Sequence, residues 1–388
     1  MQRPFNFFGY ELTNSFKCTA KDMMNIAKAY RLEVESKINN DSFIRSYINV
    51  NNGINSELSK IVLAIDIGGT TLKIGLLVIS PDGSETFLKT PLKITLPKRE
   101  EKYNVFMWTA MHIRDYLPKM YYGKAYAVLS FSYPMEIIEK SKAKILDVTK
   151  LGNVSEIQIY SDPVELMNNA LKEYKIGVKV ALILNDSTAT FLASYKTDPS
   201  TFLGIILGTG TNGAFILDSG EIIVSEWGSF QSKSIKQTSF DKKIAKSAKE
   251  RNTYTGFTEC MIGGCNFLEL ANHVLEKRKY QKLESLQDIL SHKENSSEEH
   301  QIIMMIKSRN LSILAGMICG VALAKKVTGY AVVSCNGSIL EDPECYKILK
   351  AEVEECKSQF EELRRTYFDF KFINEGTLVG SAMGVYYI

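Results

Sequence analysis

The chain has 388 residues, too many for one small hydrophobic core, and this length predicts about two or three domains. Hydrophobic residues make up 45% of it and charged residues 23%, as in ordinary globular enzymes. The formal net charge of +3, without a basic run that alternates with aromatic residues, argues against a nucleic-acid partner.

The seven cysteines form neither a Cys-x-x-Cys motif nor a cluster with histidine, so we expect no disulfide framework and no zinc site. The N-terminal sequence lacks the apolar stretch of a signal peptide. The longest apolar run, residues 311–324, has 14 residues, fewer than the roughly 20 that cross a bilayer. We therefore expect a cytoplasmic protein without an integral membrane segment; a secreted form would need a start codon farther upstream.

Helical and strand patterns alternate along the chain. Apolar residues recur at helical spacing from Ala20 to Ile38, and Ile61 opens IVLAIDI, an apolar, β-branched run typical of a central strand. Similar runs predict strands at 72–79, 125–132, 178–184, 202–207, 213–217 and 330–334. Helices are expected at Val105–Tyr116, Pro163–Tyr174, Cys260–Glu276 and Ile302–Lys326. Residues 277–299, rich in Lys, Glu, Gln and Ser, predict solvated surface or an insertion, and the mixture as a whole predicts an α/β protein.

Two segments, AIDIGGTTLKIGLLVI and IILGTGTNGAFIL, both read as strand, Gly/Thr turn, strand. Such turns let backbone N–H groups approach a phosphate, so two of them could grip one polyphosphate. The alternative is a pair of ordinary β-hairpins. Asp66, in the apolar strand before the first turn, suits Mg²⁺ beside phosphates, or else bonds to its own turn. Lys73 could add positive charge there.

The strongest catalytic candidate is Asp186. The run VALILNDSTATFLAS predicts a buried strand that ends at Asn185-Asp186 and continues as a helix, and ligands of open α/β sheets gather at such strand ends. A carboxylate there can accept a proton from a substrate hydroxyl that attacks phosphorus. Read alone, the pair could equally be a helix cap.

A sugar site needs several polar side chains around one small cavity. Besides Asn185, the sequence offers Ser132, Thr149, Lys150, Asn212, Glu226 and Glu259. On composition alone, Thr149, Lys150 and Glu259 could equally be solvated surface residues.

From about residue 20 to its C-terminus, the chain resembles the eukaryotic-type hexokinase family. LAIDIGGTTLKIGLLV and LGIILGTGTNGAF resemble the two phosphate loops, and LILNDSTATFLAS resembles the catalytic strand. VLSFSYP resembles the segment that precedes the sugar loop, and DVTKLGN the Thr-Lys element of that loop. SEWGSF and FTECMIGGCNFLEL resemble the segments with two sugar-binding glutamates, and VVSCNGSIL and NEGTLVGSAMGVYY the adenosine-contacting elements.

The resemblance implies the two-domain ribonuclease-H-like ATPase fold shared by actin, sugar kinases and chaperone ATPases, with a cleft between the domains. The small domain would hold residues 61–186 and 375–388, and the large domain residues 1–60 and 187–374. The implied activity is ATP-dependent phosphorylation of a hexose, with Mg²⁺, by a monomer or homodimer. The alternative is a catalytically weak, hexokinase-like sugar sensor or regulatory protein.

Residue roles follow the same resemblance. Asp186 matches the catalytic base, with Ser132, Thr149, Lys150, Asn185, Asn212, Glu226 and Glu259 as sugar contacts. The nucleotide contacts would be Asp66, Gly68, Gly69, Thr70, Thr71, Lys73, Gly208, Thr209, Gly337, Ser338, Gly376 and Thr377, with Asp66 holding Mg²⁺ through water.

The departures from the family pattern lie mostly on the nucleotide side. Thr71 stands where Asn is usual, Lys73 where Arg is usual, and Asn336 where Asp is common. The last loop reads EGTLVG instead of the glycine- and lysine-containing form of the family. Tyr133 replaces the usual Phe. We therefore expect a weaker or relaxed nucleotide preference with catalysis retained.

Overall fold

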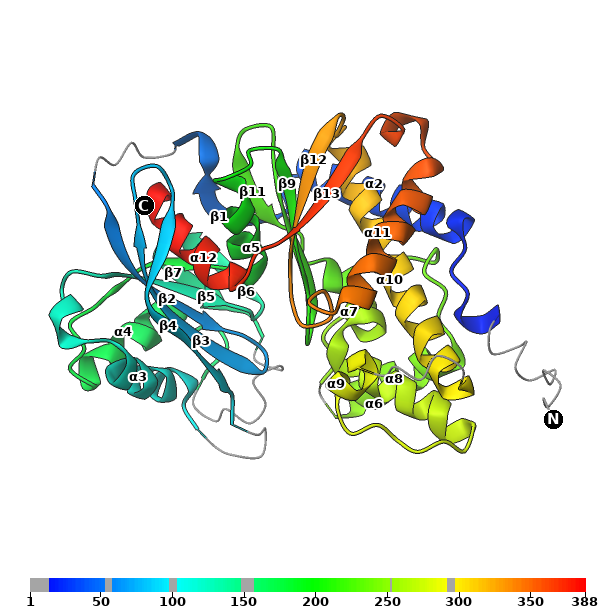
Figure 1. The fold of residues 1–388 in the computed structure, drawn as a ribbon, viewed down its shortest axis with the longest axis horizontal. Coiled ribbons are helices and arrows are strands. Elements are labelled where there is room, and N and C mark those ends of the chain that lie inside the picture. Colours follow the sequence, from blue (N-terminus) through cyan, green and yellow to red (C-terminus); the bar gives the residue numbers. More distant parts are fainter. Residues whose placement is uncertain (1–13, 53–57, 98–102, 148–156, 252, 292–296) are drawn as a thin grey trace.

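The computed structural model describes residues 14–52, 58–97, 103–147, 157–251, 253–291 and 297–388. Two β-sheets lie side by side, and helices cover their outer faces (Figure 1). One sheet has five strands and the other six. This arrangement confirms the predicted α/β class.

The five-stranded sheet has the order β4-β3-β2-β5-β8. Its strands are β2 (Lys60–Ile67), β3 (Thr71–Ile79), β4 (Glu85–Thr95), β5 (Tyr126–Phe131) and β8 (Val180–Leu184). β2, β5 and β8 run parallel, whereas β2, β3 and β4 form an antiparallel meander. A two-stranded hairpin of β6 (Met135–Glu139) and β7 (Lys142–Ile145) follows β5.

Strand β2 is apolar throughout because both faces of its sheet are covered. Leu63 and Ile65 share a core with α3 (Val105–Tyr116) and α4 (Pro163–Glu173). Val62 and Ala64 face the other way, into a core with α5 (Asp186–Tyr195) and α12 (Gly376–Met383).

The six-stranded sheet has the order β1-β11-β10-β9-β12-β13. Its strands are β1 (Ile44–Asn49), β9 (Thr201–Leu207), β10 (Thr211–Ile216), β11 (Glu221–Val224), β12 (Tyr330–Asn336) and β13 (Tyr367–Phe372). Its main core includes α2 (Ala20–Asn39), α6 (Ser239–Glu250), α8 (Gly264–Lys277), α10 (Glu298–Ala324) and α11 (Pro343–Ser358). Strand β9 pairs antiparallel with β10 and parallel with β12, so the sheet is mixed.

Helix α10 has 27 residues and is apolar enough over an 18-residue window to cross a membrane by length and composition. However, 83% of that window is buried inside the fold, where α2 and α11 pack against it. Gly316 and Gly320 allow the approach of α2, because a Cβ at either position would lie 2.9 Å from Ile26 or Ala27. Burial of this kind is what a core helix requires.

Two expectations were wrong in part. The helix expected at Cys260–Glu276 is two helices, α7 (Phe257–Ile262) and α8, because the backbone is extended at Gly263. The region 277–299 is not all solvated surface: α9 (Leu286–Ser291) buries Ile289 and Leu290. The predicted domain boundaries stay a prediction, and we propose that each sheet with its covering helices forms one domain.

Candidate active site

A cavity of about 200 Å³ lies between the ends of the two sheets and contains most of the predicted site residues. Its lining includes Asp66, Gly68, Gly69, Thr70, Thr71, Lys73, Ser132, Asn185, Asp186, Gly208, Thr209, Asn212, Glu226, Glu259, Gly337, Ser338 and Thr377. Gly376 does not line the cavity but lies beside Thr377, and Thr149 and Lys150 fall outside the described residues.

The two Gly/Thr turns meet across this cavity. Each is a hairpin turn: Gly68 N–H bonds to the Thr71 carbonyl, and Gly208 N–H to the Gly210 carbonyl, both at 2.9 Å. The hydroxyl oxygens of Thr70 and Thr209 are 3.3 Å apart. Both turns are therefore β-hairpin turns, as the alternative predicted. The two hairpins belong to different sheets and meet at the cavity.

Asn185 and Asp186 lie where β8 ends and α5 begins. Asn185 is the N-cap: its Oδ1 accepts hydrogen bonds from the Ser187 N–H at 2.9 Å and the Ser187 hydroxyl at 2.6 Å. The acceptor of Asn185 thus serves the cap, and its amide nitrogen is the group left for a ligand. Asp186 occupies the first helical position, where the helix dipole favours an ionised carboxylate.

Asn212 and Glu226 form the polar centre on the predicted sugar side. Asn212 Nδ2 donates to Glu226 Oε1 at 2.7 Å and lies 3.5 Å from Asn185 Oδ1. Glu226 has a left-handed backbone (φ 47°, ψ 40°), which is unfavourable for a side chain of this size. Strain of this kind tends to be retained where a side chain must point to a fixed place.

Glu259 is not a surface residue, because only 2% of it is exposed. Its Oε2 accepts a hydrogen bond from the Thr211 N–H at 2.9 Å. Gly228 makes room for it: a Cβ there would lie 3.2 Å from the Glu259 Cβ. The surface alternative is therefore excluded for Glu259.

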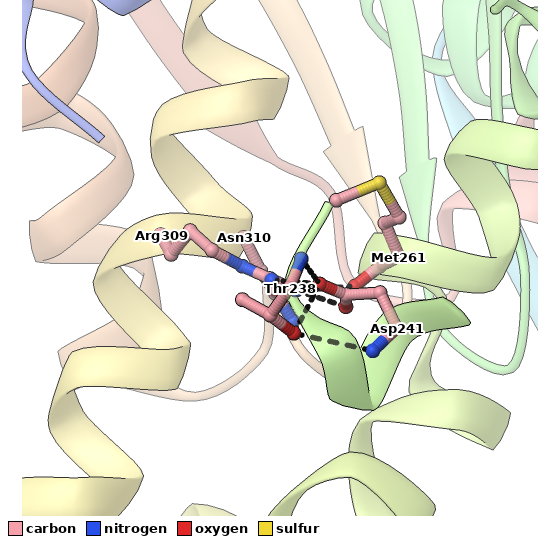
Figure 2. A network of polar contacts seen from close by, with 5 residues as sticks. All are labelled: Thr238, Asp241, Met261, Arg309 and Asn310. Atoms are coloured by element: carbon pink, nitrogen blue, oxygen red, sulfur yellow. Dashed lines mark hydrogen bonds and ion pairs between the residues drawn. The ribbon is translucent and has the colours of Figure 1, made fainter. Parts of the chain in front are cut away.

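A buried ion pair fixes the helix that carries Glu259 (Figure 2). Arg309, on α10, bonds to both oxygens of Asp241, on α6, at 2.7 and 3.0 Å, and also donates to the Met261 carbonyl in α7 at 3.4 Å. Asp241 closes a capping box with Thr238 at the start of α6. Three helices are thus joined behind the cavity.

Asp66 is buried on the predicted nucleotide side. Its Oδ2 accepts a hydrogen bond from the Thr377 hydroxyl at 2.6 Å, while Oδ1 has no hydrogen-bond partner among the described residues. Burial raises the pKa of Asp66, against the opposing effects of the Lys73 charge and of the Thr377 and Ser130 hydroxyls. Lys73 Nζ itself lies 3.3 Å from Glu375 Oε2.

A carboxylate oxygen without a hydrogen-bond partner, beside a predicted phosphate-binding turn, suits Mg²⁺ carried by a nucleotide, because Mg²⁺ usually takes one or two carboxylates and keeps several waters. Across the described ranges, no group of three or more His, Cys, Asp or Glu could hold a metal by itself. Asp66 therefore fits a metal that would arrive with the nucleotide phosphates.

The cavity also has lining residues that the sequence did not identify as site candidates, among them Lys93, Tyr133, Thr211 and Glu341. Lys93 lies directly opposite Lys73 on the neighbouring strand. A lysine facing another lysine across a pair of strands next to a Gly/Thr turn is a signal that could have identified it. In the sequence, Tyr133 stands out only as a replacement of the family's usual Phe.

Hexokinase family models match residues 10–195 and 202–284 of the chain. The chain belongs to the hexokinase family. Hexokinase-1 of Saccharomyces cerevisiae is 32% identical over 161 residues, which cover 39% of this chain and 33% of that protein. Glucokinase of Aspergillus niger is 26% identical over 261 residues, which cover 55% and 52%. These matches thus span between a third and about half of the relatives' own lengths.

The fold is also that of solved hexokinases. A Schistosoma mansoni hexokinase complexed with glucose superposes with a TM-score of 0.77 at 20% identity, over 97% of both chains. A second hexokinase crystal structure gives 0.74 at 16% identity, again over 97% of both. At these identities the likeness concerns the fold, and it confirms the two-domain, actin-like sugar-kinase architecture.

Proposed function

We propose that this chain is an ATP:hexose 6-phosphotransferase, with D-glucose as the first candidate substrate and fructose and mannose as further ones. One observation carries the proposal: Asp186 shares a single cavity with the Asn212–Glu226 pair and with both Gly/Thr turns. A carboxylate, a set of sugar-hydroxyl partners and two phosphate-binding turns are the groups that this reaction needs.

In the proposed mechanism, the sugar hydroxyls bind to Asn185, Asn212, Glu226 and Glu259, which orient the 6-hydroxyl toward Asp186. Asp186 accepts the hydroxyl proton as that oxygen bonds to the γ-phosphorus, and the bond from phosphorus to the β–γ bridging oxygen breaks to release ADP. Mg²⁺ bound to the nucleotide would neutralise charge on the phosphates, beside Asp66. Ser132 and the turn backbones would hold sugar and phosphates in line. Closure around the sugar would exclude water, which could otherwise accept the phosphoryl group.

The proposal is tested with the pure chain, glucose and Mg·ATP in a coupled assay for glucose 6-phosphate. Turnover that requires both substrates supports it. Glucose binding without turnover would instead favour the sugar sensor. The Lys73–Glu375 ion pair favours that second candidate, because it occupies a cation that would otherwise face the phosphates.

We also propose a reducing, cytosolic location, since Cys319, Cys335, Cys345 and Cys356 are buried as free thiols, and a monomer or homodimer as the assembly.

A further inference from the structure

Tyr133 joins the predicted sugar loop to the first phosphate turn. It follows Ser132 directly and is 1% exposed. Its hydroxyl donates a hydrogen bond to the carbonyl oxygen of Gly68 at 2.8 Å. The ring packs against Phe131, with 4.7 Å between ring centroids, so the hydroxyl is held in place by the core.

The bond to Gly68 sets the direction of the next backbone donor. In a planar trans peptide, the carbonyl of Gly68 and the N–H of Gly69 point in opposite directions, and the described peptides include no cis bond. Fixing this carbonyl against Tyr133 therefore turns the N–H of Gly69 away from the tyrosine.

That N–H group is available to a ligand. Within the described part of the chain, no backbone or side-chain acceptor takes a hydrogen bond from Gly69. Gly69 lines the cavity, and a Cβ at this residue would lie 3.5 Å from Thr209 in the second turn. An unpaired donor between two Gly/Thr turns is suited to a phosphoryl oxygen.

We infer that Tyr133 is a positioning residue for the nucleotide: its hydroxyl holds the Gly68–Gly69 peptide so that the Gly69 N–H faces a phosphoryl oxygen. The inference rests on the proposed function, because it assigns the turn to the phosphates of ATP. A hydroxyl that only satisfied the buried Gly68 carbonyl would affect stability and leave nucleotide affinity unchanged.

The test is Tyr133→Phe, which deletes only the hydroxyl. Losing one oriented donor should raise the KM for Mg·ATP and the Kd for Mg·ADP about 3- to 10-fold, the range of a single net hydrogen bond. The KM for glucose should stay unchanged. Tyr116→Phe is the matched control, since the Tyr116 hydroxyl also donates to a backbone carbonyl, that of Lys89, but lies outside the cavity.

Each outcome is decisive. A fall in Tm with both nucleotide constants unchanged, or equal changes in the constants for glucose and ATP, would overturn the inference. A matching rise in the Tyr116→Phe control would overturn it too, because the effect would then be general to the sheet. If the parent chain binds Mg·ADP without turnover, the proposed function fails, yet the Kd comparison still decides the role of Tyr133. If the parent binds no nucleotide at all, both proposals fail.

Discussion

The Oε2 of Glu259 accepts a hydrogen bond from the backbone N–H of Thr211 at 2.9 Å. Thr211 opens the strand that follows the second Gly/Thr turn, and its hydroxyl accepts from Trp227 Nε1 at 2.9 Å. Trp227 follows Glu226 in the chain. Thr211, which directly follows the second Gly/Thr turn, therefore supports both glutamates of the predicted sugar site.

Because Glu259 bonds to Thr211, directly after the second Gly/Thr turn, we predict that Glu259 affects the binding of both glucose and ATP. Glu259→Ala should raise the KM for glucose about 10- to 100-fold, the range of a hydrogen bond to a charged group. It should also raise the KM for Mg·ATP, because the Thr211 N–H loses its acceptor. Glu259→Gln is the matched control: its amide oxygen can still accept from Thr211, so the ATP constant should recover while the glucose constant does not. A change in the glucose constant alone for Glu259→Ala would contradict the shared support.

Asp186 should affect chemistry and not sugar binding. Asp186→Ala should lower kcat by at least about 100-fold, since general-base catalysis contributes 10²- to 10⁴-fold. The Kd for glucose should change little, and it can be followed by the fluorescence of Trp227 in a Trp108→Phe background, because the chain has two tryptophans. Asp186→Asn, which keeps the shape, should be equally inactive. Substantial activity in either variant would remove Asp186 from the mechanism.

We expect the ionised Asp66 side chain to destabilise the fold and to favour nucleotide binding. Burial raises its pKa above 3.8, so the folded state holds the proton more tightly than the unfolded chain. Ionised Asp66 therefore lowers the free energy of unfolding as pH rises through the raised pKa. Asp66→Asn should raise the Tm at neutral pH, and this advantage should vanish at acid pH, where the parent residue is also neutral. The same variant should raise the KM for Mg·ATP. A lower Tm at neutral pH would show that the carboxylate stabilises the fold.

The sequence predicts those parts of the fold in which one segment determines its own structure. β2 and β8 are apolar runs, and α3 has the predicted bounds, because its apolar face and its Asn104 cap are both local. β1 was not predicted, since its burial alternates weakly and it exists through pairing of Ile44 with Val224, far along the chain. The break at Gly263 depends on a distant contact too: Gly264 N–H bonds to the Gly208 carbonyl.

In the candidate site, too, residues within one short motif are predictable from the sequence, whereas contacts between distant segments are not. Asp186 and the Gly/Thr turns were recognisable because motif and strand end coincide in one short segment. The Tyr133 hydroxyl was not, because its partner Gly68 is 65 residues away in the chain. Arg309 lies in an apolar helix, and no local pattern indicates its contact with Asp241.

The pair of Lys73 and Glu375 bears on the expected nucleotide preference. Both side chains are partly exposed, at 13% and 23%, and Glu375 is the N-cap of α12, two residues before Thr377. Glu375→Gln should release Lys73 toward the phosphates and lower the KM for Mg·ATP by up to about 5-fold, the equivalent of a partly exposed ion pair. Lys73→Met should raise the KM for Mg·ATP.

A nucleotide panel should also show relaxed selection of the nucleotide by the parent chain. Strict, tight use of ATP would refute that expectation.

The buried pair of Arg309 and Asp241 (Figure 2) should matter most to stability, since the two residues are 3% and 2% exposed. Removing one partner leaves an uncompensated buried charge, so Arg309→Met or Asp241→Asn should each cost about 3–5 kcal/mol of unfolding free energy. The double variant leaves no buried charge and should lose much less than the sum of the single variants. Urea unfolding of the four proteins measures this coupling, and additive losses would show that the two charges stabilise the fold independently.

Because Arg309 also donates to the Met261 carbonyl, Arg309→Met should in addition raise the KM for glucose through Glu259. Asp241→Asn keeps that donor and should raise the KM for glucose less.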